Sequence, residues 1–405
     1  MAMTSGREGF TSTIIPGMTA PGKLLIAAVT GLAVALGVVA VPYARTAAFL
    51  LDLAGIEDAR RTWIPIAPVP VTHRDIGVET RHGSVAVRAY VPTAPSPPAV
   101  VVFPGVHGGG VDAPRLTRLC QRLSSSGLLV VCAPLPDLRE FRITARTTDM
   151  IEDVTAWVAA DRTLAPSGRV TLVGVSFAGG LALVAAGRET LHDRLEAVVS
   201  IGGHGDLNRT LDYLITGRLP DGTIRAPHDY PLAIVALTLA RRLVPEGQVA
   251  RFEAGVTTFL QASLDESADG APARALLASL ATDLETMPEP AKGLVAAVVR
   301  RDVTTIGKAV APYVDDFGRN PALSPALAPR TSAPVYLLHG GDDNVIPSTE
   351  TPLTAADLAA HGNMHVRWLL TPLVTHAHLV TSASARDVWR LISFWRDVRQ
   401  TAQPF

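Results

Sequence analysis

The hydrophobic pattern divides the chain into an apolar N-terminal run, two α/β regions and a helical region between them. Short continuous runs of β-branched residues, such as residues 99–103 (AVVVF), are typical of strands that are buried on both faces of a sheet. Helix-like stretches separate these runs, which predicts a mostly parallel, doubly wound sheet with helices on both faces. The predicted strands are residues 75–80, 84–91, 99–103, 128–132, 169–175, 196–201, 333–339 and 365–370.

The alternation of strands and helices stops between residues 208 and 330. This region contains mostly helix-like stretches and predicts a helical cap that is inserted over the sheet. The α/β core is then expected in two parts, residues 73–207 and residues 331–405. The predicted helices of the insertion are residues 232–243, 248–264, 271–284 and 292–299.

The N-terminal region raises the question of a membrane. Residues 24–41 (LLIAAVTGLAVALGVVAV) are uncharged, and at ~1.5 Å per residue they would span about 27 Å, close to a hydrocarbon core. After a tail at 1–23, we therefore expect a transmembrane or signal-anchor helix at 24–42 and a location at the membrane. A cleaved signal peptide, which would release a secreted protein, and a buried soluble helix are the alternatives. Basic residues lie on both sides of the run, so they do not set its orientation.

The segment that follows, residues 43–72, reads as an amphipathic stretch and a Pro-containing linker. Its apolar part, residues 47–56, is too short to cross a bilayer. It is expected either to lie on the membrane surface or to pack on the globular part.

Composition excludes several classes of protein. The chain has 405 residues, 48% of them hydrophobic, and a net charge of −1, which argues against a disordered chain and against nucleic-acid binding. Two cysteines cannot make a disulfide scaffold or a four-thiolate zinc site; we expect buried thiols, or one helix-to-strand disulfide if the domain is exported. No H-E-x-x-H or G-x-G-x-x-G pattern points to a metal or dinucleotide cofactor. The preference for Arg over Lys indicates a GC-rich, bacterial genome.

The strongest chemical signal is at residues 173–180 (VGVSFAGG), where a buried strand turns directly into a helix. Small residues around Ser176 allow the sharp turn that would lift a nucleophilic hydroxyl above the sheet edge. The N–H of Phe177 would point to the same place and hold a developing oxyanion. The alternative is a Gly-rich turn in which Ser176 is only a helix N-cap.

GVSFAGG resembles the nucleophile elbow of the α/β-hydrolase superfamily, which includes esterases, lipases and dienelactone hydrolases. The usual pattern is G-x-S-x-G, and here Ala178 stands at the second glycine position. The resemblance covers residues 76–394, with the insertion as its least similar part and the N-terminal anchor outside it. It implies the α/β-hydrolase fold: a mostly parallel, doubly wound sheet with a helical cap.

In this family the loop after the first core strand supplies a second oxyanion donor. Here that loop is residues 104–110 (PGVHGGG), and two registers are open. If Pro104-Gly105 replaces the usual His-Gly, the donor is the N–H of Val106. If residues 107–110 match the HGGG motif of lipases and esterases, the donors are the glycine amides. His107, Gly108 and His204 are further candidates for substrate contacts.

The resemblance also implies an acid and a base. Residues 337–347 (LLHGGDDNVIP) resemble the pattern H-G-x-x-D-x-x-V/I-P, which places the acid at Asp343, with Asp206 as the alternative. After the last predicted strand, Thr-His-Ala at residues 375–377 makes His376 the expected base, with His378 as its rival. Ser176, Asp343 and His376 then follow in the chain order of this fold.

The sequence therefore predicts a membrane-anchored serine hydrolase that cleaves carboxylic esters through an acyl-enzyme, without a cofactor. The substrate would be a small-molecule or lipid-like ester. A peptidase or acyltransferase on the same fold is the first alternative, because fold does not decide the reaction. A non-catalytic, membrane-tethered binding protein is the second. The oligomeric state stays open.

Overall fold

The computed structural model describes residues 37, 40–264, 270–374 and 384–402, together with the backbone of residue 265 in the helix that ends there. Its centre is an eight-stranded sheet with the order β1-β2-β4-β3-β5-β6-β7-β8. β1 and β2 form an antiparallel hairpin, β2 is antiparallel to β4, and all other neighbours are parallel. The strands are β1 (Val71–Thr80), β2 (Gly83–Pro92), β3 (Ala99–Phe103), β4 (Leu129–Cys132), β5 (Val170–Val175), β6 (Leu195–Ile201), β7 (Val335–Gly340) and β8 (Val366–Thr371).

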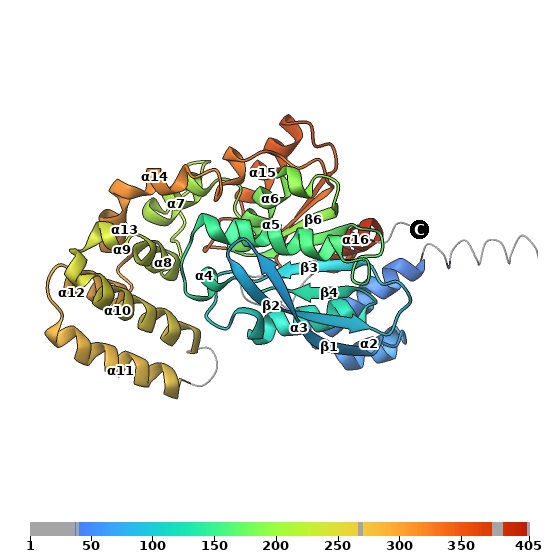
Figure 1. Ribbon diagram of the computed structural model, residues 1–405, viewed down its shortest axis with the longest axis horizontal. Coiled ribbons are helices and arrows are strands. Elements are labelled where there is room, and N and C mark those ends of the chain that lie inside the picture. Colours follow the sequence, from blue (N-terminus) through green and yellow to red (C-terminus); the bar gives the residue numbers. More distant parts are fainter. Residues whose placement is uncertain (1–36, 38–39, 266–269, 375–383, 403–405) are drawn as a thin grey trace, which may run out of the picture.

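Helices cover both faces of this sheet (Figure 1). α5 (Ala145–Ala160), α6 (Phe177–Ala186) and α15 (Glu350–Ala360) pack on one face, and α3 (Pro114–Ser125) and α16 (Ala385–Ala402) on the other. Alternate side chains of a central strand enter two different cores. In β3, Val101 and Phe103 join the core under α5 and α6, whereas Val100 and Val102 join the core under α3 and α16. This two-sided burial is why the strand has no polar residue.

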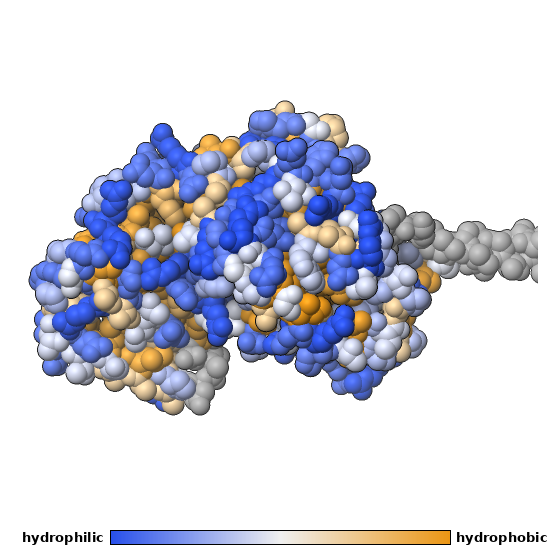
Figure 2. Space-filling view, viewed as in Figure 1, coloured by the Kyte–Doolittle hydropathy of each residue, from blue (hydrophilic) through white to orange (hydrophobic). Residues whose placement is uncertain are grey.

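The region between β6 and β7 is helical and forms the cap at the left of Figure 1. Its most apolar helix, α8, is buried from Pro231 to Leu237, so the run PLAIVAL packs inside the cap. Polar and apolar residues are mixed on the face of the cap that Figure 2 shows. The cap helices are α7 (Leu207–Thr216), α8 (Tyr230–Thr238), α9 (Ala240–Leu243), α10 (Glu246–Asp265), α11 (Ala271–Thr286), α12 (Ala291–Val299), α13 (Val303–Val310) and α14 (Val314–Gly318).

The N-terminal part of the described chain packs on the body. Residues 40–53 are helical, and α2 (Glu57–Trp63) follows them. Phe49 is buried and meets Trp395 of α16 edge-on, with ring centroids 5.6 Å apart. Asp52 accepts a 2.6 Å bond from Arg60, and both side chains are buried. Of the two placements expected for residues 47–56, the structure has the one on the globular part.

The membrane segment predicted at 24–42 lies almost entirely outside the described residues. Within the part of the chain that the structure describes, no helix is both long enough and apolar enough to cross a bilayer. The two cysteines of the expected thiol pair, Cys120 and Cys132, are both buried and free. A hydrogen bond between the two thiols and their burial raise the pKa of Cys120 well above its usual value.

Candidate active site

Ser176 stands alone between the last residue of β5 and the first residue of α6. Its φ of 54° and ψ of −132° lie in a region that non-glycine residues rarely adopt. Two backbone hydrogen bonds hold this turn: the N–H of Ser176 donates to the carbonyl of Ile201 at 2.7 Å, and its own carbonyl accepts from Gly179 at 2.7 Å. Neighbouring strands and the helix therefore fix a conformation that would otherwise relax. The hydroxyl is carried at the carboxyl end of the central strands.

The small residues around Ser176 are required because larger side chains would collide with neighbouring atoms. A Cβ on Gly174 would collide with the backbone carbonyl of Ala178, and one on Gly179 would approach Ser200 Oγ to 2.5 Å. Ala178 itself is fully buried, so its methyl group fits where the usual pattern has glycine. The variant sequence thus builds the same sharp turn.

The loop after β3 comes directly against Ser176. β3 pairs with β5, and Phe103 is the partner of Gly174. A Cβ built on Gly105 would lie 2.8 Å from the Ser176 Cβ and 3.3 Å from its Oγ, which leaves room only for a hydrogen. Val106 is the next residue in this loop. Phe177 begins α6, and the first N–H groups of a helix have no acceptor within the helix.

The glycines farther along this loop use their amides differently. The N–H of Gly109 donates to His107 Nδ1 at 3.0 Å, and that of Gly110 donates to the His107 carbonyl at 2.9 Å. A Cβ on Gly108 would meet Phe141 and the cap residue Leu264 at 3.3 Å. The loop thus turns back on itself after His107, and the amides of Gly109 and Gly110 are both used within the loop.

Asp343 is buried in the loop after β7. Its Oδ1 accepts hydrogen bonds from the N–H groups of Val345 at 2.8 Å and Ile346 at 3.1 Å. Its Oδ2 lies 3.3 Å from Nε2 of His339, the fifth residue of β7. Donors thus approach both carboxylate oxygens. Its neighbour Asp342 is exposed.

The alternative acid, Asp206, caps a helix of the insertion. It is the N-cap of α7, and its Oδ1 accepts from the N–H of Arg209 at 3.1 Å. The backbone N–H of Asp206 donates to Glu350, a fully buried carboxylate that also accepts from Gly205 and from the Arg209 guanidinium. These contacts make Asp206 part of the packing between cap and sheet.

Both candidate bases, His376 and His378, lie outside the described residues. The last residues before them are described: β8 ends at Thr371, whose carbonyl accepts the N–H of Gly341 at 3.0 Å. The end of β8 is therefore hydrogen-bonded to the loop that carries Asp343, and the two histidines follow from there in the sequence.

The two other candidate histidines are both partly or fully enclosed. His204 has no exposed surface; its ring stacks on Phe177 at 4.6 Å, and Nε2 donates to the Leu323 carbonyl at 2.7 Å. Burial lowers the pKa of His204, so it is a neutral packing group beneath α6. Burial and the charge of Arg115 also lower the pKa of His107, which keeps its Nδ1 an acceptor for Gly109.

Several residues around Asp343 carried no sequence signal. The neighbouring carbonyl of Asn344 accepts from the N–H of His228 at 2.8 Å and from the Tyr213 hydroxyl at 3.4 Å, so the cap is tied to this loop. Burial, followed by the charges of Asp343 and Asp229, raises the pKa of Tyr230. These residues come from distant parts of the chain, and only the fold brings them together.

Nothing in the described part of the chain offers a metal site, because no three His, Cys, Asp or Glu side chains gather with a suitable arrangement. The described features are a serine on a strained strand–helix turn at the start of α6 and a buried carboxylate after β7, which β6 separates from β5. This arrangement suits acyl transfer, in which a hydroxyl attacks a carbonyl and amides hold the oxyanion.

No protein-family model matches the chain, and no curated protein matches it in sequence. Similar solved structures include an esterase from Pyrobaculum calidifontis (17% identity, 88% of this chain and 92% of that chain, TM-score 0.46). A bacterial brefeldin A esterase, a homologue of human hormone sensitive lipase, is 16% identical over 88% of this chain and 84% of that chain (TM-score 0.44). An acylaminoacyl peptidase from Pyrococcus horikoshii is 13% identical over 85% of this chain and 44% of that chain (TM-score 0.48).

These similarities are too distant to decide a reaction. The assignment of the α/β-hydrolase fold rests on this chain's own features: the mostly parallel, eight-stranded sheet, the helices on both of its faces and the serine turn after β5. The predicted α/β core with its helical insertion is confirmed on these grounds, whereas the transmembrane helix predicted with it lies almost entirely outside the described residues.

Proposed function

We propose that the chain is a serine hydrolase that cleaves carboxylic esters with Ser176 as its nucleophile. The observation that carries this proposal is the backbone of Ser176, held at φ 54° between β5 and α6 with Gly105 against its Oγ. A serine that only caps a helix would use its side chain on the helix amides, and the cap geometry shows no such bond. A strained turn that presents a hydroxyl at the sheet edge is instead what a nucleophile needs.

In the proposed reaction, His376 takes the proton of Ser176 Oγ as the oxygen attacks the ester carbonyl. The N–H groups of Phe177 and Val106 hold the oxyanion of the tetrahedral intermediate. The carbonyl then re-forms, the alcohol leaves with the proton from His376, and the acyl group stays on Ser176. Water, deprotonated by His376, releases the acid in the same way. Asp343 fixes the imidazole and stabilises its charged form.

The cap and the N-terminal run bear on the substrate and the location. Phe141 of the core and Leu264 of the cap lie beside Gly108, so apolar side chains approach the loop of the proposed oxyanion donors and favour an ester with an apolar acyl group. The uncharged run at 24–41 supports a single-pass membrane anchor, with secretion after cleavage as the alternative. A lipid-like ester held near a bilayer fits both features.

Labelling with a fluorophosphonate tests the proposal directly. The full-length chain in neutral detergent should be labelled, and Ser176→Ala and His376→Ala should each lose the label. Labelling that survives His376→Ala and is lost in His378→Ala would move the base by two residues. An unlabelled, folded wild type would exclude the hydrolase and favour a binding protein.

Substrate and reaction class need a second measurement. A chain-length series of p-nitrophenyl esters should show the highest kcat/KM for apolar acyl groups, and p-nitroanilide analogues should be cleaved much more slowly. An added alcohol should not outcompete water for the acyl-enzyme. Preferred transfer to the alcohol would indicate an acyltransferase, and preferred anilide cleavage would indicate a peptidase.

A further inference from the structure

A cavity of about 740 Å³ lies at the opposite end of the sheet from Ser176. Its wall includes Ala99 and Glu196, which are at the amino ends of β3 and β6, whereas Ser176 follows the carboxyl end of β5. Its other wall is the N-terminal helix, through Ala48 and Phe49. The proposed hydrolase reaction has no use for this cavity.

Some of the charged residues that line the cavity have a partner of opposite charge, and others do not. Of its five ionisable lining residues, Asp52 pairs with Arg60 at 2.6 Å, Arg122 pairs with Glu57, and Glu196 lies 3.7 Å from Arg169. The other two are Arg45 and Arg399, and within the described residues neither has an acidic partner. The cavity wall therefore keeps two positive charges that no acid of the described chain neutralises.

Arg399 is the more telling of the two because it is only 9% exposed. Its Nη2 donates to the carbonyl of Ser126 at 3.0 Å, but its buried Nη1 has no acceptor among the described residues. Burial, and to a lesser extent the charge of Arg45, lower the pKa of Arg399 to about 10, so it is still charged at neutral pH. A buried guanidinium N–H without an acceptor is costly. An anion in the cavity would remove that cost.

The position of the cavity indicates which anion. The apolar run ends at Val41, and Arg45 follows four residues later, about 6 Å along the same helix. The helix enters the body beside α16 (Figure 1), where Tyr43 stacks on Trp389 at 5.0 Å and Trp389 is 56% exposed. Aromatic and basic residues just past an apolar span are typical of the headgroup layer of a membrane.

We propose that this cavity binds the phosphate of an anionic phospholipid headgroup through Arg399 and Arg45. The inference rests on the proposed membrane anchor, because the bilayer brings the lipid to the cavity. An anionic lipid is favoured over phosphatidylcholine, since the unmatched charges are both positive and the acids on the wall already have partners. The apolar surface of Phe49 and Ile66 would contact the glycerol and upper acyl chain.

The test is a binding titration on the full-length chain in neutral detergent. The probe is dihexanoyl-phosphatidylglycerol, compared with dihexanoyl-phosphatidylcholine and with inorganic phosphate, and bound lipid is counted by native mass spectrometry. One phosphatidylglycerol should bind per chain and raise the Tm by mass action. Its affinity should fall at least tenfold in Arg399→Gln and at least threefold in Arg45→Gln. The exposed Arg45 variant keeps the test valid if Arg399→Gln fails to fold.

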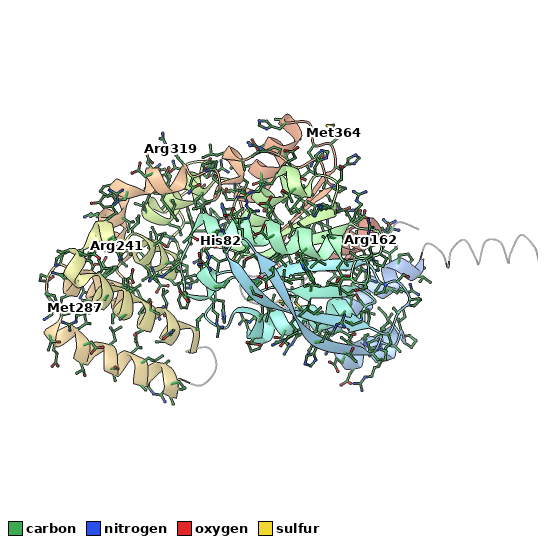
Figure 3. All side chains as sticks on the ribbon, viewed as in Figure 1. His82, Arg162, Arg241, Met287, Arg319 and Met364 are labelled. Atoms are coloured by element: carbon green, nitrogen blue, oxygen red, sulfur yellow. The ribbon has the colours of Figure 1, made fainter. Side chains whose placement is uncertain are left out.

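Arg241→Gln is the matched control, because Arg241 lies on the cap, far from the cavity. Figure 3 shows Arg241 at the opposite end of the molecule from Arg162, and Arg162 marks the cavity because it donates to the carbonyl of Pro166 on the cavity wall. It should bind phosphatidylglycerol as the wild type does. Unchanged binding in both cavity variants would overturn the proposal. So would phosphate binding as tight as the lipid, which indicates a free-phosphate site.

Two separate readouts distinguish this inference from the proposals beneath it. Fluorophosphonate labelling of Ser176 reports the hydrolase, and retention in the membrane fraction after alkaline washing reports the anchor. Arg399→Gln and Arg45→Gln should leave both unchanged. If the wild type binds no lipid although it is labelled by the fluorophosphonate and retained in the membrane fraction, the lipid site alone is overturned.

Discussion

At the scale of single residues, the candidate site depends on the backbone more than on side chains. Ser176 is held in a conformation that costs of order 1–3 kcal/mol, and the hydrogen bonds to Ile201 and from Gly179 keep it there. Gly105 completes the arrangement because any larger residue would press on the serine. Such a site is sensitive to a methyl group that would be harmless elsewhere.

Gly105→Ala should therefore abolish most of the activity while the protein stays folded. The added Cβ would lie 2.8 Å from the Ser176 Cβ, so the loop must retreat and carry the Val106 amide with it. Loss of one oxyanion donor costs about 10²–10³-fold in kcat, which is the decrease we expect with a p-nitrophenyl ester. Gly247→Ala adds the same methyl group in open space and is the control. Equal activity of the two variants would contradict a role of this loop in catalysis.

The two candidate acids are separated by a pair of isosteric changes. Asp343→Asn removes the charge beside the proposed histidine, and we expect kcat to fall by about 10⁴-fold. Asp206→Asn keeps an N-cap of similar quality, so both stability and kcat should change little. Steady-state kinetics and thermal unfolding of both variants check this. The reverse order of activity loss would assign the acid to Asp206.

At the scale of elements, the sequence predicted the core well where burial is two-sided. The run at 99–103 is β3 to the residue, and Leu128–Cys132 and Arg169–Val175 differ from β4 and β5 by one residue at their start. β-branched runs specify such strands because both of their faces must be apolar. The short helix α4 (Pro136–Arg139) was missed, since four residues are too few to show a period.

The site was predictable only in part, for a physical reason. Ser176 and Asp343 follow strands and carry local motifs, so their neighbourhood can be inferred from the sheet. Glu350, Tyr230 and the cap contacts of Asn344 depend on pairs far apart in the chain, and no local pattern encodes these. The placement of His204 beneath α6 also follows from long-range packing rather than from its motif.

Ion pairs of Asp229 stabilise the cap, and their contribution to stability should depend on pH. Asp229, just before α8, pairs with Arg301 at 2.7 Å and with His228 at 2.6 Å, and these partners outweigh its burial and lower its pKa to about 2. A carboxyl whose folded pKa is depressed stabilises the fold above its unfolded pKa, and this contribution is lost as pH falls toward 2.

Asp229→Asn should consequently lower the Tm at pH 7, and its gap to the wild type should shrink as pH falls from about 4 toward 2. Thermal unfolding at a series of pH values gives this gap. Asp58→Asn, at a side chain that is 99% exposed, should match the wild type throughout. A gap that stays constant with pH would mean that the asparagine acts through packing and not through the lost charge.

At the scale of the whole molecule, the N-terminal helix connects the apolar run to the body and is itself packed against the body. Phe49 is 3% exposed and contacts Trp395, Asp52 and Arg60 form a buried pair, and Tyr43 lies against both Trp389 and Arg396. Any anchor at 24–42 would thus be joined to the body by a rigid, packed helix rather than by a free linker. The orientation of the body on a membrane would then be set by this helix.

This arrangement predicts where the chain can be cut. Removal of residues 1–39 should leave the Tm of the body unchanged, whereas removal of residues 1–63 should lower it sharply, because it uncovers Trp395 and deletes the Asp52–Arg60 pair. Phe49→Ala in the full chain should cost about 3–5 kcal/mol of unfolding free energy, as expected for a buried aromatic. Thermal and denaturant unfolding of the two truncations and the point variant measure this. If the longer truncation is as stable as the shorter one, the helix is a tether that does not stabilise the body, and its packing against the cavity does not contribute to the stability of the fold.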